Sequence, residues 1–258
     1  MNALNTNSPA WSSHAPLATQ GNSSNIDFFN RLLRRSPELM TVTPTTYSRQ
    51  SITRTVIRRG ARQHHVGLYA SRRNKALVPF ESTLEKQACA LLESQPRLVG
   101  YRTQPCAIQL PIDGKTRKVY PDFELTTVNG VALVDVKYEK ASRKLAFQAR
   151  ASALQEYANQ RGMNYAVLTE QHIRVPRMTA TTWLMSLANG DARPQLHKAV
   201  RTWLSSLYGS TIGDLFDLSA GYPAVQNVLA SSILDGHLRV DWDYPIKDQL
   251  VIFSIEEQ

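Results

Sequence analysis

Residues 120–140 read Tyr-Pro-Asp-Phe-Glu-Leu-Thr-Thr-Val-Asn-Gly-Val-Ala-Leu-Val-Asp-Val-Lys-Tyr-Glu-Lys, and this stretch decides the fold. Two runs of β-forming residues flank the pair Asn129-Gly130. Asn-Gly between such runs is the strongest short hairpin signal, because both residues tolerate positive φ. The sequence therefore predicts a β-hairpin that brings Asp122, on the first strand, close to Asp135 on the second.

Lys137 follows Asp135 by two positions, so on a β-strand the two side chains point to the same face. Two acids and a lysine at strand ends resemble the signature of PD-(D/E)xK nucleases, here Pro121-Asp122 followed by Asp135-Val136-Lys137. In that superfamily the acids hold a divalent cation, usually Mg²⁺, which prefers carboxylate oxygens and keeps several waters. The lysine acts on the attacking water. An ordinary hairpin with solvated charges is the alternative.

The composition indicates a soluble, packed protein. A chain of 258 residues with 42% hydrophobic residues suits one large domain or two ordinary ones. No run approaches the roughly 20 apolar residues of a membrane span, and the polar N-terminus does not resemble a secretory signal. Cys89 and Cys106 lack metal-site spacing and are expected to be reduced thiols. We expect a cytoplasmic, nucleoid-associated protein.

The net charge of +9 is unevenly distributed. Residues 1–25 contain no Lys, Arg, Asp or Glu and are predicted to form a disordered tail. Residues 26–80 carry 11 Lys and Arg against 2 Asp and Glu. We interpret residues 26–78 as a basic DNA-binding arm that starts with a short helix at 26–39; residues 49–75 would lie extended on DNA phosphates, with a solvated loop as the alternative. The candidate DNA-binding residues of this arm are Arg54, Arg58, Arg59, Arg62, Arg72, Arg73 and Lys75.

A helix is predicted over residues 81–94, because Leu84, Ala88 and Leu91 recur at core spacing. Ser82 and Glu85 also fit a capping box, in which the acid closes the first helical turn. The functional alternative makes Glu85 a third carboxylate of the metal site, and Glu81 lies one turn earlier on the same face.

Further elements complete a nuclease domain over residues 79–172. Strands are predicted at 98–110, broken by Pro105, and at 118–127, joined by an Asp113-Gly114 turn, and the hairpin follows them. A helix is predicted from 142 to 160 with Leu145, Ala149 and Leu154 facing inward, and then a parallel strand at 164–169. The order αβββαβ is the minimal core of the restriction-endonuclease-like fold.

Four motifs in this order resemble the TnsA family, the endonuclease subunits of heteromeric, Tn-seven-like transposons. They are Phe80-Glu-Ser-Thr-Leu-Glu85, Thr103-Gln-Pro105, Tyr120-Pro-Asp-Phe123 and Val134-Asp-Val-Lys137. The resemblance covers roughly residues 62–170, and it favours Glu85 over Glu81 because the family's acid follows Leu in Ser-x-Leu-Glu. It implies four catalytic residues, with the three acids as metal ligands: Glu85, Asp122, Asp135 and Lys137.

The resemblance also implies an activity and partners. The expected enzyme is a Mg²⁺-dependent DNA endonuclease, with Mn²⁺ able to substitute, that cuts one strand at transposon ends during cut-and-paste transposition. The metal would polarise the scissile phosphate, and Lys137 would act on the attacking water. Expected partners are transposon-end DNA, a DDE-type transposase and an AAA+ ATPase regulator. The alternatives are a restriction or repair nuclease and a catalytically idle, DNA-bound scaffold.

Residues 173–258 are predicted to form a C-terminal, winged-helix-like α+β domain, with a generic helical appendage as the alternative. Helices are expected at 194–208, 211–218 and 222–234, and paired strands at 237–242 and 249–255. The helix that would enter a DNA groove, 222–234, has no Lys or Arg, and residues 211–258 carry 2 basic and 8 acidic side chains. We therefore expect this domain to bind a protein.

Overall fold

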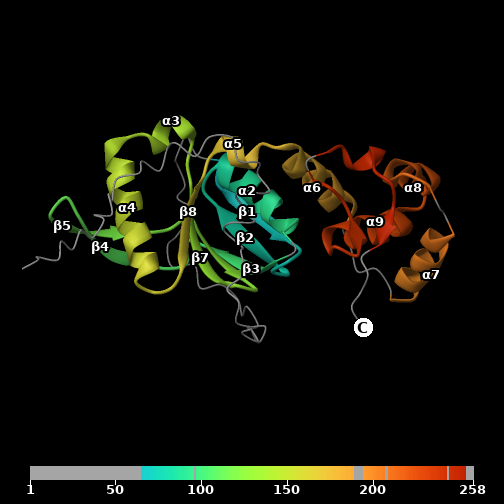
Figure 1. Ribbon diagram of the computed structural model, residues 1–258, viewed down its shortest axis with the longest axis horizontal. Helices are drawn as coiled ribbons and strands as arrows, with labels where there is room; N and C mark the ends of the chain where they lie inside the picture. Colours follow the sequence, from blue (N-terminus) through green and yellow to red (C-terminus); the bar gives the residue numbers. More distant parts are fainter. Residues whose placement is uncertain (1–64, 96, 189–193, 207–208, 243, 254–258) are drawn as a thin grey trace, which may run out of the picture.

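The computed structural model describes residues 65–95, 97–188, 194–206, 209–242 and 244–253. These residues form two lobes, one around a mixed sheet and one of packed helices (Figure 1). None of the helices in the described ranges has the length and apolar character that crossing a membrane requires. Predictions for residues 1–64, including the disordered tail and most of the basic arm, lie outside the described residues.

The central sheet contains four strands in the order β3-β6-β7-β8. Their bounds are Leu98–Thr103, Phe123–Thr127, Gly130–Val136 and Asn164–Leu168. β6 pairs with β3 and β7 in antiparallel fashion, whereas β7 and β8 are parallel. A parallel pair needs a crossover connection, and helix α4 (Leu145–Asn159) provides it. The predicted parallel strand after the second helix is thus confirmed.

The β6–β7 hairpin forms where the sequence predicts it, but its turn is displaced by one residue. Thr127 pairs with Gly130, so the two-residue loop consists of Val128 and Asn129. Gly130 has φ of 123°, whereas Asn129 does not have positive φ. The Thr127 hydroxyl donates to the Gly130 carbonyl at 2.9 Å and accepts from the Asn129 amide at 3.1 Å. These bonds close the turn without the expected pair of positive φ angles.

Helices α2 (Thr83–Glu93) and α4 cover opposite faces of this sheet. Val134 of β7 packs in the same cluster as residues of α2, and its neighbour Leu133 packs with Leu154 of α4. Leu145, predicted to face inward, is instead 83% exposed. At 100° per residue it lies on the opposite side of α4 from Leu154, which is fully buried.

An additional hairpin interrupts the predicted strands. Residues 98–110 and 118–127 do not form two strands but four, because β4 (Ile108–Ile112) and β5 (Lys115–Val119) pair only with each other in the described structure. The breaks fall near Pro105 and Pro121, which lack the N–H that a continuous ladder needs. The αβββαβ order remains, with this hairpin inserted between β3 and β6.

The end of the predicted arm is also a hairpin. β1 (Gly67–Ser71) pairs with β2 (Ala76–Phe80), so the chain is not extended up to Lys75. Buried Glu93 at the end of α2 accepts hydrogen bonds from the Ser71 hydroxyl at 2.6 Å and the Tyr101 hydroxyl at 2.8 Å. These bonds fasten the β1–β2 hairpin to the sheet lobe.

The second lobe is mainly helical. Before it, the short helix α5 (Glu170–Ile173) still packs on the sheet lobe, against α2 and β8. The elements of the second lobe are α6 (Pro176–Leu187), α7 (Pro194–Ser205), α8 (Ile212–Leu218), α9 (Pro223–Leu234), β9 (Leu238–Arg239), a 3-10 turn (Ile246–Asp248) and β10 (Ile252–Phe253). α6, which the sequence did not predict, packs against both α2 and α9. The terminal strands pair over only two residues each, so the winged-helix assignment stays a prediction.

Side chains from both lobes meet at the junction. Arg177 of α6 is buried and donates to the Ser94 hydroxyl at 2.9 Å and the Ser94 carbonyl at 2.5 Å, directly after α2. Its guanidinium also lies 4.7 Å from the centre of the Trp242 ring. Ile173 is fully buried in the core between α2 and the sheet. The packed core therefore continues past the predicted boundary at residue 172.

Candidate active site

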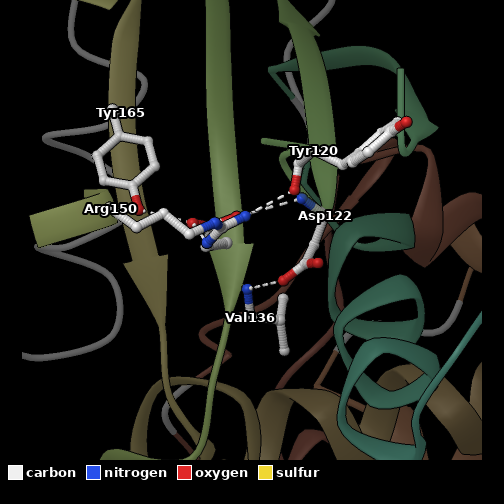
Figure 2. Close-up of polar contacts among 6 residues, drawn as sticks. Tyr120, Asp122, Val136, Arg150 and Tyr165 are labelled. Carbon is white, nitrogen blue, oxygen red and sulfur yellow. Dashed lines mark hydrogen bonds and ion pairs between the residues drawn. The ribbon is translucent and has the colours of Figure 1, made fainter. Parts of the chain in front are cut away.

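Asp122 and Asp135 lie opposite each other where the β6–β7 ladder ends. The last ladder pair is Phe123 with Val134. Beyond it, the carboxylates of Asp122 and Asp135 accept hydrogen bonds from backbone amides of the opposite strand. The Asp122 amide donates to Asp135 Oδ1 at 3.3 Å, and the Val136 amide donates to Asp122 Oδ2 at 2.7 Å (Figure 2). The predicted approach of the two acids is thus present.

The Asp135 carboxylate is fully buried on the α4 face of the sheet. Arg150 of α4 donates to both carboxylate oxygens, and the Tyr165 hydroxyl of β8 donates to Oδ2 at 2.8 Å (Figure 2). With the Asp122 amide, three protein groups donate four hydrogen bonds to this one carboxylate. A buried charge needs such pairing, because burial without partners is costly.

Arg150 also links the two strands of the site. Its second nitrogen donates to the Tyr120 carbonyl at 2.6 Å and to Asp135 Oδ1 at 3.1 Å. Burial, followed by the charge of Asp135, raises the pKa of Tyr165 far above its usual value, so its hydroxyl stays a donor. Arg150 of α4 therefore helps to hold Tyr120 in place, two residues before Asp122.

Asp122 lies in an excess of negative charge. Burial raises the pKa of its carboxyl well above the usual value, and the charges of Asp135 and Glu85 act in the same direction. The Val136 amide and Arg150 partly offset these effects. A cation at this position would relieve the repulsion.

Glu85 closes the first turn of α2 as predicted, but its carboxylate accepts from the backbone amide of Glu81 and not from that of Ser82, so the capping box is incomplete. Ser82 is the N-cap of α2, its hydroxyl accepting from the Glu85 amide, and the Glu85 carboxylate accepts from the Ser82 hydroxyl at 2.9 Å and the Glu81 amide at 2.8 Å. Burial raises the pKa of Glu85, whereas the charge of Lys137 lowers it. Lys137 is exposed directly after β7. The capping acid and the candidate catalytic lysine are thus electrostatic neighbours.

The fit of this arrangement to a divalent cation is partial. The charge of Glu85 acts on Asp122, and both side chains offer the carboxylate oxygens that Mg²⁺ prefers. The oxygens of Asp135, in contrast, already accept from Arg150, Tyr165 and the Asp122 amide. Throughout the described ranges, no three His, Cys, Asp or Glu side chains are grouped closely enough to hold a metal ion.

The candidate DNA-binding residues of the arm divide into two sets. Arg54, Arg58, Arg59 and Arg62 lie outside the described residues. Within the β1–β2 hairpin, Arg72 forms a bidentate pair with Asp235 at 2.6 and 2.7 Å, and Arg73 donates to the carbonyls of Glu93 and Leu98. Lys75 is exposed in the turn. Arg72 and Arg73 thus fasten the hairpin to both lobes.

Comparison with protein families gives one match at this site. Residues 93–170 match the family model described as TnsA-like endonuclease N terminal. Over these residues the chain is similar to TnsA-like endonucleases. No curated protein gave a significant match to the chain. The resemblance found in the sequence motifs is confirmed, and the TnsA-like segment runs from the end of α2 through the sheet to the start of α5.

The TnsA-like segment contains two site residues that the sequence reasoning missed, Arg150 and Tyr165. Arg150 lies four positions before Leu154, so it shares the buried side of α4. A charged residue on such a side signals a buried partner, and this signal was available in the sequence. Tyr165 lies in an apolar strand, where an aromatic residue is expected for packing alone and does not indicate a polar partner.

The dual position of Glu85 makes a testable prediction. Glu85→Ala should lower DNA cleavage about 10²-fold, because it removes a carboxylate whose charge acts on Asp122. Ser82→Ala is the matched control: it removes the cap, at about 1 kcal/mol of stability, and should leave cleavage near the wild-type rate. Glu81→Ala should also retain more activity than Glu85→Ala. The rate of cleavage is measured on end-labelled DNA. If Ser82→Ala and Glu85→Ala lower this rate equally, Glu85 acts only as a helix cap.

Proposed function

We propose that this protein is the metal-dependent DNA endonuclease subunit of a heteromeric transposase, which cuts one strand at transposon ends. The observation that carries the proposal is the approach of Asp122 and Asp135 at the end of the β6–β7 ladder, within a TnsA-like endonuclease segment. The charge of Glu85 also acts on Asp122, and the charge of Lys137 acts on Glu85.

Mg²⁺, or Mn²⁺ in its place, would be held by Asp122 and Glu85, with Asp135 as the third expected ligand. Such an ion supplies Lewis-acid polarisation of the scissile phosphate and lowers the pKa of a water. Lys137, exposed at the strand end, would hold or move a proton at the attacking water, or stabilise charge on the phosphate oxygens. Asp135 and Arg150 would keep residues 120–122 in position.

One observation favours a second candidate, the catalytically idle scaffold. The Asp135 oxygens are engaged by protein donors, and no three-acid group is present in the described residues. Cleavage of duplex DNA carrying a transposon end separates the two candidates. The full chain, its transposase and Mg²⁺ should yield a cut in one labelled strand that EDTA abolishes. DNA binding without any cut would favour the scaffold, and cutting of arbitrary DNA without the transposase would favour a restriction or repair nuclease.

The helical lobe supports a protein partner. Helix α9, which would enter the DNA groove in a winged helix, is buried from Asn227 to Leu234 and forms the core of its lobe. Large hydrophobic side chains are instead exposed elsewhere on the lobe: Leu218, Tyr222, Tyr244, Leu250 and Ile252. Exposed aromatic residues on an acidic background suit a basic protein surface. The expected partners are the DDE-type transposase and an AAA+ regulator.

Replacement of Leu218 and Tyr222 by Ser should therefore weaken binding to the transposase about tenfold or more, because buried aromatic residues dominate interface energy. Affinity for DNA should not change. Leu68→Ser with Leu77→Ser is the matched control, since these residues are 50% and 60% exposed on the β1–β2 hairpin. Isothermal titration with each partner measures the effect. Wild-type affinity for both partners in the Leu218/Tyr222 variant would contradict this assignment.

A further inference from the structure

The β4–β5 hairpin carries an exposed row of positive charge. Four of the five residues of β5 are exposed, and three of these are Lys115, Arg117 and Lys118. The buried residues of the hairpin pack on the α4 side of the nuclease lobe: Ile108, Leu110, Ile112 and Val119. The hairpin lies at the end of the nuclease lobe away from the helical lobe (Figure 1).

These charges are weakly compensated. Arg117 approaches Asp113 at 3.7 Å, but both side chains are more than half exposed, so the pair contributes little. Lys115 and Lys118 have no ion pair within the described part of the chain, and Lys118 lies 5.5 Å from the centre of the Tyr120 ring. By comparison, Arg72 and Arg150 are engaged by carboxylates. The row therefore stays available to an external anion.

The chemistry of the hairpin selects the anion. Its exposed residues are polar, charged, Pro or Gly, and none of those described there is a large hydrophobic residue. A protein interface needs such residues at its centre, whereas a phosphate backbone needs Lys and Arg on a polar surface. The surface of the helical lobe differs, because it exposes several large hydrophobic residues.

The hairpin is also close to the candidate site. Lys118 precedes Asp122 by four residues, and a chain of that length spans at most about 14 Å. One turn of duplex DNA is roughly 34 Å long. A duplex with its scissile phosphate near Asp122 would therefore pass β5 within half a turn.

We propose that β5 binds the phosphate backbone of the duplex flanking the cleavage position, through Lys115, Arg117 and Lys118. This inference rests on the proposed function, because it takes DNA as the substrate. The contacts position the duplex and carry little base identity. They are independent of the basic arm before residue 65.

The test is the salt dependence of DNA binding. A fluorescent 30-base-pair duplex of arbitrary sequence is titrated with the full chain in EDTA, so that no cleavage occurs. The triple variant Lys115→Gln, Arg117→Gln, Lys118→Gln should bind about 10- to 100-fold more weakly at low salt. Its slope of log affinity against log salt should fall by about 2 to 3, since each phosphate contact contributes about 0.9.

Two controls make the result specific. Lys198→Gln, Arg239→Gln, Lys247→Gln removes the same charge from exposed positions of the helical lobe and should keep the wild-type slope. Lys115→Arg with Lys118→Arg should also keep it. An unchanged slope in the β5 variant would overturn the inference and leave the proposed function standing. The same conclusion would follow if the β5 variant lost binding to the transposase but kept wild-type binding to DNA. A wild-type chain that does not bind DNA would overturn both.

Discussion

Asp122→Asn should lower the rate of DNA cleavage about 10³-fold and, at the same time, raise the melting temperature at neutral pH. The loss of activity follows from removal of a charge at the candidate reaction centre. The gain in stability follows because the folded state raises the pKa of Asp122, by burial and by Asp135 and Glu85. Asn keeps the oxygen that accepts from the Val136 amide.

The stabilisation has a defined pH dependence. Below the unfolded pKa of about 4 the aspartate is protonated in both states, so variant and wild type should melt alike. As pH rises towards the raised folded pKa, the wild type loses stability and the difference grows. Differential scanning calorimetry in EDTA between pH 4 and 8 measures it. Adding Mg²⁺ should then raise the melting temperature of the wild type and have little effect on the variant.

Two results would contradict this prediction. A variant that cleaves at the wild-type rate would remove Asp122 from the reaction. A variant that is less stable than the wild type at pH 8 would show that the Asp122–Val136 bond outweighs the repulsion. Asp113→Asn, at an exposed position of the β4–β5 turn, is the matched control and should change neither quantity.

Arg150→Met should lower the free energy of unfolding by about 3–5 kcal/mol, because it leaves the buried Asp135 carboxylate without its cation. Tyr165 and the Asp122 amide would remain as donors but would not neutralise the charge. Urea denaturation followed by circular dichroism gives the value. This is the largest stability effect expected for a single side chain of the site.

A double variant separates burial of charge from loss of packing. Arg150→Met combined with Asp135→Asn should be more stable than Arg150→Met alone, because the unpaired charge is gone. Arg143→Met is the control, since Arg143 forms an exposed pair with Glu139 and should cost less than about 1 kcal/mol. A cost below about 1 kcal/mol for Arg150→Met would show that Asp135 reaches solvent or another cation.

Local signals predicted the frame of the nuclease lobe. The spacing of Leu84, Ala88 and Leu91 predicted α2, and Ser82 with Glu85 predicted its start. Asn129-Gly130 located the hairpin, although the turn itself begins one residue earlier. Each of these features depends on residues close in sequence, so pattern and propensity suffice.

The engagement of Asp135 could not be read in the same way. Whether a carboxylate at a strand end faces water or a helix depends on which residue of α4 lies above it. That register is set by packing of Leu154 and Ala151 on the sheet, between residues distant in sequence. The β1–β2 hairpin was missed for a related reason, because its Arg72 and Arg73 resembled a DNA-binding run until Asp235 and Glu93 were placed beside them.

Helix α2 connects the candidate active site to the helical lobe. Its first turn contains Glu85. Ser94 at its other end accepts a hydrogen bond from Arg177, whose guanidinium also lies over the Trp242 ring. Eleven residues of α-helix form a rod roughly 16 Å long, stiff along its axis because its hydrogen bonds run parallel to it. A displacement of Arg177 that moved Ser94 along the axis of α2 would therefore also move Glu85 at the other end of the helix.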